Sequence, residues 1–165
     1  MKGWGRFRTL KERGEWVELV FMAAAASHGY HVLKPSGDSR AYDVAIELGG
    51  NLIRVQVKST TKRANTGYSS QFRRSDGAKK PYTLDEVDFF AVYIVPLSVW
   101  YLIPAVVVLR PIRRVAVTLC PLPQEGSRCK YEHYREAWGL LGKTRRDLAR
   151  ASKSRKLQPR SGGMR

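Results

Sequence analysis

The chain has 165 residues, of which 43% are hydrophobic, so it is long enough for one domain with a packed core and is neither wholly disordered nor fibrous. Its 30 Lys and Arg residues against 14 Asp and Glu give a net charge of +16, which predicts a polyanionic partner: nucleic acid or an anionic membrane surface. The longest uncharged apolar run, 89–109, is broken by Pro96 and Pro104, and the first 13 residues lack a signal-like apolar stretch, so we expect no membrane partner and a cytoplasmic protein.

The predicted elements begin with an apolar helix over 13–28 that carries Glu15 and Glu18 on one face. Strands are expected next, in chain order, over 30–33, 42–48, 52–59, weakly within 68–73, and over 89–95, 99–103 and 115–119. A capped helical turn is expected over 83–87, residues 105–109 fit either a helix or a strand, and an amphipathic helix is expected over 131–141. This order predicts a small α+β or mixed α/β domain over 1–142, and the basic segment 143–165 is predicted to be a disordered tail.

Most of the positive charge lies in three segments. Residues 1–13 carry +4, residues 54–80 carry +7 and residues 143–165 carry +8, whereas the rest of the chain carries −3. Charge gathered in blocks favours phosphate binding over general solubility.

The hairpin around Gly49 and Gly50 brings polar residues together. If these two glycines form a two-residue loop, Asp43 lies opposite Gln56, and Lys58 points to the same side of the sheet. A three-residue loop, 49–51, would instead put Asp43 on the other face. In the first register the carboxylate, the Gln56 amide oxygen and the Val57 carbonyl are suitable Mg²⁺ ligands; in the alternative interpretation, the polar face of the hairpin is simply solvated.

Several segments of the chain together resemble the PD-(D/E)XK nuclease superfamily. They are the apolar first helix bearing Glu, Gly-Asp-Ser-Arg-Ala-Tyr-Asp at 37–43, Arg-Val-Gln-Val-Lys-Ser at 54–59, and the later strands at 88–93 and 99–104. The sequence is most similar to the bacterial subgroup of intron-encoded homing endonucleases, in which Gln replaces the motif's first acidic residue. The resemblance spans about 11–141. It implies an α/β, restriction-endonuclease-like core: a mixed central β-sheet flanked by an N-terminal and a C-terminal helix.

The resemblance also assigns roles to individual residues. Asp43, Gln56 and Lys58 match the motif, and Glu18 matches its helix glutamate better than Glu15 does, because Glu18 lies among apolar neighbours. The implied metal ligands are Asp43, Gln56, Glu18 and the backbone carbonyl of Val57, with Mg²⁺ as cofactor and Mn²⁺ as the alternative. Gln56 removes one negative charge from the usual site, so Asp43 and Glu18 must supply the electrostatics.

The basic loop that follows Lys58 is predicted to bind DNA. Its cations would contact phosphates, and Gln71 and the arginines would also reach base edges from a strand in the major groove. The candidate contacts are Lys62, Arg63, Tyr68, Gln71, Arg73, Arg74, Lys79 and Lys80. A solvated flexible loop is the alternative interpretation.

These features predict a magnesium-dependent endonuclease for double-stranded DNA, site-specific in the manner of homing or restriction enzymes. One active site cuts one strand, so we expect a homo-oligomer, either a dimer or a tetramer. The alternatives are a non-catalytic DNA- or RNA-binding protein on a decayed nuclease scaffold, and a junction-resolving or repair nuclease.

Overall fold

A computed structural model describes residues 7–37, 40–74, 81–109, 116–121, 129–143 and 147–148. The elements are, in chain order, α1 (Leu10–Ser27), β1 (His31–Leu33), β2 (Val44–Leu48), β3 (Asn51–Thr60), β4 (Arg63–Ala64), β5 (Gly67–Gln71), β6 (Phe89–Ile94), β7 (Val99–Pro104), α2 (Ala105–Leu109) and β8 (Ala116–Leu119). Short 3₁₀ helices cover Val95–Leu97, Glu132–Tyr134 and Trp138–Gly142. Residues 105–109, which fitted either a helix or a strand in the sequence, are therefore helical.

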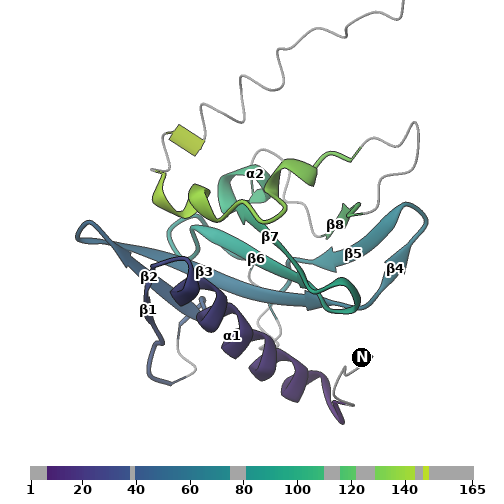
Figure 1. The fold of residues 1–165 in the computed structure, drawn as a ribbon, viewed down its shortest axis with the longest axis horizontal. Helices are drawn as coiled ribbons and strands as arrows, with labels where there is room; N and C mark the ends of the chain where they lie inside the picture. The colour runs from purple at the N-terminus through teal and green to yellow at the C-terminus, as the bar shows by residue number, and fades with distance from the viewer. Residues whose placement is uncertain are drawn as a thin grey trace, which may run out of the picture.

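The strands form a mixed central sheet and a smaller second sheet. The central sheet has the order β1-β2-β3-β6-β7, in which β3 and β6 run parallel and the other neighbours run antiparallel. The second sheet has the order β4-β5-β8. Figure 1 shows the β2–β3 hairpin projecting at one end of the molecule and β4 and β5 at the other. The predicted mixed central sheet is confirmed.

The β2–β3 hairpin has the two-residue loop. Val44 pairs with Val55, and Leu48 pairs with Asn51, so the strands turn at Gly49 and Gly50. Both glycines have positive φ, 56° and 75°, a conformation that L-residues with a side chain adopt at a cost and that such a tight turn requires. Because this register continues to the start of β2, Asp43 and Gln56 lie on the same face.

The helix α1 covers one face of the central sheet (Figure 1). It begins three residues earlier than expected, because the Thr9 side chain caps it by accepting a hydrogen bond from the Glu12 N–H at 3.1 Å. Its buried stripe of Val17, Phe21 and Ala25 joins a core cluster with Val55 and Val57 of β3, among others. This packing fixes α1, and with it Glu18, against the strand that carries Gln56 and Lys58.

The opposite face of the central sheet is covered by the second sheet and α2. Inward side chains of β5 and β8, such as Tyr68 and Leu119, form a second core cluster with Phe90 and Val92 of β6. The side chains of Gln56 and Lys58 share this face, because they alternate with Val55 and Val57. The predicted site residues Gln56 and Lys58 therefore lie on the side of β3 that faces the second sheet.

The predicted C-terminal helix over 131–141 is wrong. The segment forms two short 3₁₀ helices, and between them Arg135 makes a bridge to Tyr101 at the edge of β7. Glu136 has a φ of 47°, and its carboxylate accepts hydrogen bonds from the Trp100 N–H at 2.6 Å and the Trp138 indole at 2.8 Å. Contacts with β7 thus replace the backbone bonds that a continuous helix would have made.

The remaining sequence predictions concern the end of the chain and the membrane. Most of the predicted tail, 144–146 and 149–165, lies outside the described residues. Leu148 within it is buried in the first core cluster, so the packed chain extends at least to this residue. Among the described helices, none has the length and apolar character needed to cross a membrane.

Candidate active site

Asp43 lies directly before β2 and is the residue on which the predicted site depends. Its Oδ2 accepts a hydrogen bond from the Val57 N–H at 2.8 Å and another from the side-chain amide of Gln56. The pKa of Asp43 is raised to about 6, chiefly because burial disfavours the charged carboxylate and also because Glu18 is negative. Three neighbouring groups lower this pKa: the Val57 N–H, the Lys58 ammonium and the Gln56 amide. A cation beside this carboxylate would therefore be favourable.

Gln56 is almost fully buried, with 7% of its surface exposed. Its Nε2 donates to Asp43 Oδ2 and also lies 3.4 Å from the carbonyl oxygen of Val57. The partly positive amide nitrogen thus lies between two oxygens that the sequence predicted as metal ligands. Half a turn about the last side-chain bond exchanges this nitrogen for the amide oxygen, which is the atom a cation needs.

Lys58 points to the same face as Gln56, two residues further along β3. Its Nζ lies 5.6 Å from the centre of the Tyr82 ring, and its positive charge helps to lower the pKa of Asp43. Tyr82 is itself fixed by edge-to-face packing on Phe90. The ammonium group thus lies over an aromatic ring and near enough to Asp43 for its charge to act on the carboxylate.

The first helix brings Glu18, rather than Glu15, to this region. The charge of Glu18 raises the pKa of Asp43, whereas Glu15 is exposed and lies 3.9 Å from Lys11. Glu18 is less buried than expected, since its side chain is 22% exposed and pairs with Lys34 at 3.2 Å. The structure thus brings Asp43, Gln56 and Lys58 together from the start of β2 and from β3, and Glu18 of α1 lies near enough for its charge to act on Asp43.

The chemistry of the donor set fits a hard divalent cation. Asp43, Glu18, the Gln56 amide and the Val57 carbonyl offer only oxygen ligands, as Mg²⁺ and Mn²⁺ prefer. Among the described residues, no three His, Cys, Asp or Glu side chains lie together as a group that could hold a metal ion, so a cation here would depend on the neutral oxygens as well as on the carboxylates. Two carboxylates and two neutral oxygens suit an ion that keeps part of its water shell.

The predicted DNA-binding residues fall into three groups. Lys62, Arg63, Gln71 and Arg73 are exposed, as phosphate or base contacts require. Tyr68 is buried at 5% exposure, so its ring is not a stacking platform, and Arg74 is ion-paired with Glu86 at 3.0 Å. Tyr68 points into the core because side chains alternate along β5. The ion pair between Arg74 and Glu86 depends on tertiary structure, so the sequence pattern did not indicate it. Lys79 and Lys80 lie outside the described residues.

Sequence reasoning missed two arginines close to the site. Arg13 of α1 donates to the hydroxyls of Ser59 and Thr61 at 3.2 and 3.4 Å, which places a cation beside the end of β3. Arg54 forms an ion pair with Asp88 at 2.9 Å. Both pairings join residues more than 30 positions apart, so no local pattern in the sequence could have revealed them.

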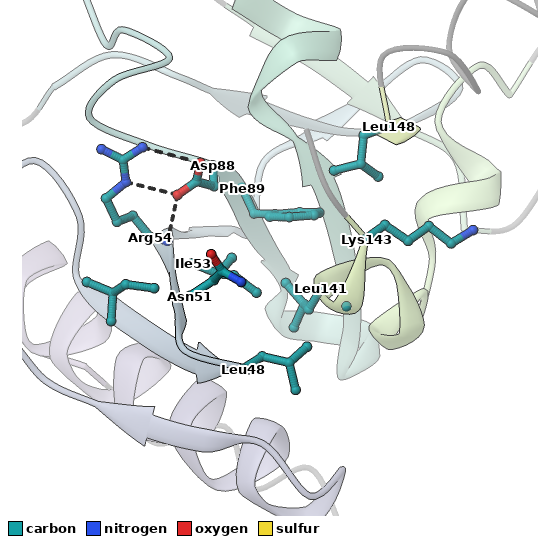
Figure 2. Close-up of a pocket in the computed structure, with 11 residues that line it drawn as sticks. Leu48, Asn51, Ile53, Arg54, Asp88, Phe89, Leu141, Lys143 and Leu148 are labelled. Atoms are coloured by element: carbon teal, nitrogen blue, oxygen red, sulfur yellow. Dashed lines mark hydrogen bonds and ion pairs between the residues drawn. The ribbon is translucent and has the colours of Figure 1, made fainter. Parts of the chain in front are cut away.

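The Arg54–Asp88 pair lines a cavity of about 450 Å³, which Figure 2 shows. Its other walls are mainly apolar and come from the β2–β3 hairpin and the C-terminal segment, with Leu48, Leu141 and Leu148 among them. The cavity contains none of the residues of the predicted motif. It is a separate feature from the group around Asp43.

The comparisons with known proteins identify the family. The model of the PD-(D/E)XK endonuclease family matches residues 9–141, and no curated protein matches the chain. The bacterial homing endonuclease I-Ssp6803I has a similar structure, with 28% identity and a TM-score of 0.67 over 88% of this chain and 98% of that one. A Holliday junction resolvase, Hjc of Archaeoglobus fulgidus, matches with 11% identity and a TM-score of 0.45 over 64% of this chain and 84% of its own. The chain therefore belongs to the PD-(D/E)XK endonuclease family and is an endonuclease.

Proposed function

We propose that this endonuclease hydrolyses phosphodiester bonds of double-stranded DNA at specific sites and requires Mg²⁺, with Mn²⁺ able to replace it. The observation that carries the proposal is the position of Asp43, which is hydrogen-bonded to Gln56 and Val57 and lies near Lys58 and Glu18. The likeness to a homing endonuclease at 28% identity supports site-specific cleavage.

In this proposal each residue has a distinct task. Asp43 and Glu18 supply the negative charge that holds the cation, while the Gln56 amide and the Val57 carbonyl add neutral oxygens. When bound, Mg²⁺ supplies electrostatic stabilisation of the phosphate and lowers the pKa of a coordinated water. Lys58 orients the attacking water or stabilises the charge that develops on the phosphate.

The charge of the chain supports DNA as the substrate. The exposed side chains of Lys62 and Arg63 follow directly after β3, the strand that carries Lys58, so cations lie close in sequence to the proposed site. Residues 143–165 add nine further basic residues in the sequence. Cutting both strands requires a second active site, so we propose a dimer or tetramer as the active form.

The test compares cleavage of a randomised duplex DNA library by the wild-type chain and by Lys58→Met with Mg²⁺ present. Methionine keeps an unbranched side chain of similar length and removes the charge that lies over the Tyr82 ring. Lys11→Met is the matched control, because Lys11 is exposed on α1. We expect cleavage by the wild type and by the control, and loss of cleavage in Lys58→Met. Equal cleavage by all three would contradict the role of Lys58, and no cleavage by the wild type would contradict the function.

A further inference from the structure

A second cavity lies between the N-terminal end of α1, the end of β3 and the turn that follows β6. Its volume is about 440 Å³. The polar residues that line it are two arginines and two threonines: Arg8, Arg13, Thr9 and Thr61. The other lining residues are apolar, and none of the lining residues carries a carboxylate. Two cationic side chains without an acidic one favour an anion as the occupant of this cavity.

Arg13 is held in the cavity by neutral partners. Its Nε donates to the Ser59 hydroxyl at 3.2 Å, and a terminal nitrogen donates to the Thr61 hydroxyl at 3.4 Å. Among the described residues, no carboxylate lies within ion-pair distance of Arg13, whereas three other arginines are ion-paired: Arg54, Arg74 and Arg135. A guanidinium has five N–H donors in one plane, so Arg13 keeps donors and a full charge for a further partner.

Arg8 adds a second cation at the mouth of the cavity, where its side chain is exposed. The nearby acidic residue, Glu12, does not line the cavity. Its carboxylate accepts the Arg8 backbone N–H at 2.7 Å, and its own N–H donates to the Thr9 hydroxyl at 3.1 Å. These backbone groups are therefore satisfied, and the attraction for an anion comes from the two guanidinium groups.

The edge of β3 next to this cavity also carries the proposed active site. The pairing of β2 with β3 ends at Val44 and Val55, and residues 57–60 pair only with β6 among the described strands. The Val57 N–H is bonded to the Asp43 carboxylate. A duplex that approaches the proposed metal site therefore approaches this edge of β3.

Arg13 and Lys58 lie on the two sides of that edge. Neighbouring residues of a strand point to opposite faces, so Lys58 faces the second sheet, whereas Ser59 faces α1 and holds the Arg13 guanidinium. Figure 1 shows the N-terminal end of α1 on the side of the molecule toward which β3 runs. Thr61 is three residues beyond Lys58, roughly 10 Å along the chain, which is about the length of three nucleotides of a DNA strand.

We propose that the cavity lined by Arg8 and Arg13 binds a phosphate of the DNA backbone within about three nucleotides of the cut. The planar guanidinium groups match phosphate oxygens, and the apolar walls can pack against the neighbouring sugar. Such a contact positions the strand relative to Asp43 without reading its sequence. The inference rests on the proposed function, which makes DNA the substrate, and it adds α1 to a DNA-binding surface that the sequence placed only beyond Lys58.

The test measures how the affinity for DNA depends on salt concentration. The full chain is bound to duplex DNA of random sequence in a metal chelator, so that no strand is cut, and the salt concentration is varied. Arg8→Gln and Arg13→Gln each remove one cation from the cavity. Lys11→Gln is the matched control, because it removes the same charge from the same end of α1 and Lys11 does not line the cavity.

We expect the slope of log K against log salt to become shallower by about 1 in Arg8→Gln and in Arg13→Gln, and to keep its wild-type value in Lys11→Gln. If Arg13 only joined α1 to β3, Arg13→Gln would lower the melting temperature and leave the slope unchanged, which would overturn the inference. An equal change in Lys11→Gln would also overturn it, because the effect would then reflect net charge alone.

Arg8→Gln keeps the inference testable even where Arg13→Gln does not fold, since an unchanged slope in Arg8→Gln would overturn it as well. Failure of the proposed function is a separate result. In that case the wild-type chain would leave duplex DNA uncut when Mg²⁺ is added, whereas the salt dependence of binding is measured without metal.

Discussion

Two aspartates contact the same strand in similar ways but differ in the partner that completes each site. Asp88 accepts the Arg54 N–H at 2.9 Å and the guanidinium of the same residue at 2.9 and 3.3 Å. Asp43 accepts the Val57 N–H at 2.8 Å, but its second donor is the neutral amide of Gln56. Asp88 therefore has a cation supplied by the fold, whereas Asp43 is bonded only to neutral groups.

The surroundings of the two carboxylates show the consequence. Hydrogen bonding to Asp88 raises the pKa of Arg54, as a stable ion pair should. Burial raises the pKa of Asp43 to about 6, so the charged form of this carboxylate is disfavoured in the metal-free protein. The pair at Asp88 is suited to holding β3 beside β6, and Asp43 is suited to binding a cation. Each of the following predictions tests this difference.

The largest expected effect is on cleavage. Asp43→Asn keeps the shape of the side chain and an acceptor for the Val57 N–H but removes the charge that is proposed to hold the cation. We expect cleavage to fall about 10³-fold, because a bound metal contributes several kcal/mol to transition-state stabilisation. The measurement is the rate of DNA cleavage per folded molecule, and a rate within a factor of a few of wild type would contradict the proposed role of Asp43.

The next effect is on folding. Asp88→Asn leaves the Arg54 guanidinium, which is 22% exposed, without its counter-charge. We expect the free energy of unfolding to fall by about 2–4 kcal/mol, since breaking a largely buried ion pair leaves an uncompensated charge. Urea unfolding measures the change. Cleavage per folded molecule should stay near the wild-type rate, and a loss as large as that of Asp43→Asn would show that the two carboxylates do not have separate roles.

The pH dependence of stability should differ between wild type and Asp43→Asn. The folded-state pKa of Asp43, about 6, lies above its usual value of 3.8, so the folded chain binds this proton more tightly than the unfolded chain does. The protonated Asp43 carboxyl therefore contributes fully to the free energy of unfolding below pH 4, and this contribution is lost as the pH rises through 6. Unfolding in a metal chelator should show wild type losing about 1–3 kcal/mol relative to Asp43→Asn between pH 4 and pH 8. If the difference in free energy of unfolding between wild type and Asp43→Asn stayed constant across this range, the claim that burial disfavours the charged form of Asp43 would be contradicted.

The smallest effect concerns Gln56. Gln56→Glu places a second carboxylate against Asp43, which should lower the stability of the metal-free protein by about 1 kcal/mol at pH 8 through like-charge repulsion. The same substitution at the exposed Gln71 is the control and should change stability little. Added Mg²⁺ should stabilise Gln56→Glu more than wild type, because the cation gains a charged ligand. Thermal unfolding with and without Mg²⁺ measures both effects.

The sequence predicted the parts of the fold that depend on local patterns. The two glycines of the β2–β3 turn and the alternation of its strands predicted a hairpin, and one of its two possible registers, which the structure adopts, puts Asp43 opposite Gln56. The Thr83–Glu86 capping contact formed as expected, with the Thr83 N–H bonded to the Glu86 carboxylate at 3.0 Å. In these cases the residues that determine the structure are close together in the chain.

The sequence failed where distant contacts decide. Tyr134, Trp138 and Leu141 have helical spacing, but the backbone of Arg135 bridges to Tyr101 of β7. This bridge separates the segment into two short 3₁₀ helices. The parallel pairing of β3 with β6 and the ion pair of Arg74 with Glu86 likewise depend on tertiary packing. A sequence pattern indicates which face of an element is apolar, but it does not indicate which other segment will cover that face.

The most direct measurement is the change in melting temperature on adding Mg²⁺ to three chains: wild type, Asp88→Asn and Asp43→Asn. Binding to the folded state alone stabilises by about 2.7 kcal/mol at a ligand concentration 100 times Kd. We expect wild type and Asp88→Asn to shift upward by similar amounts and Asp43→Asn not to shift. An equal shift in Asp43→Asn, or no shift in wild type, would contradict the claim that Asp43 holds the catalytic cation.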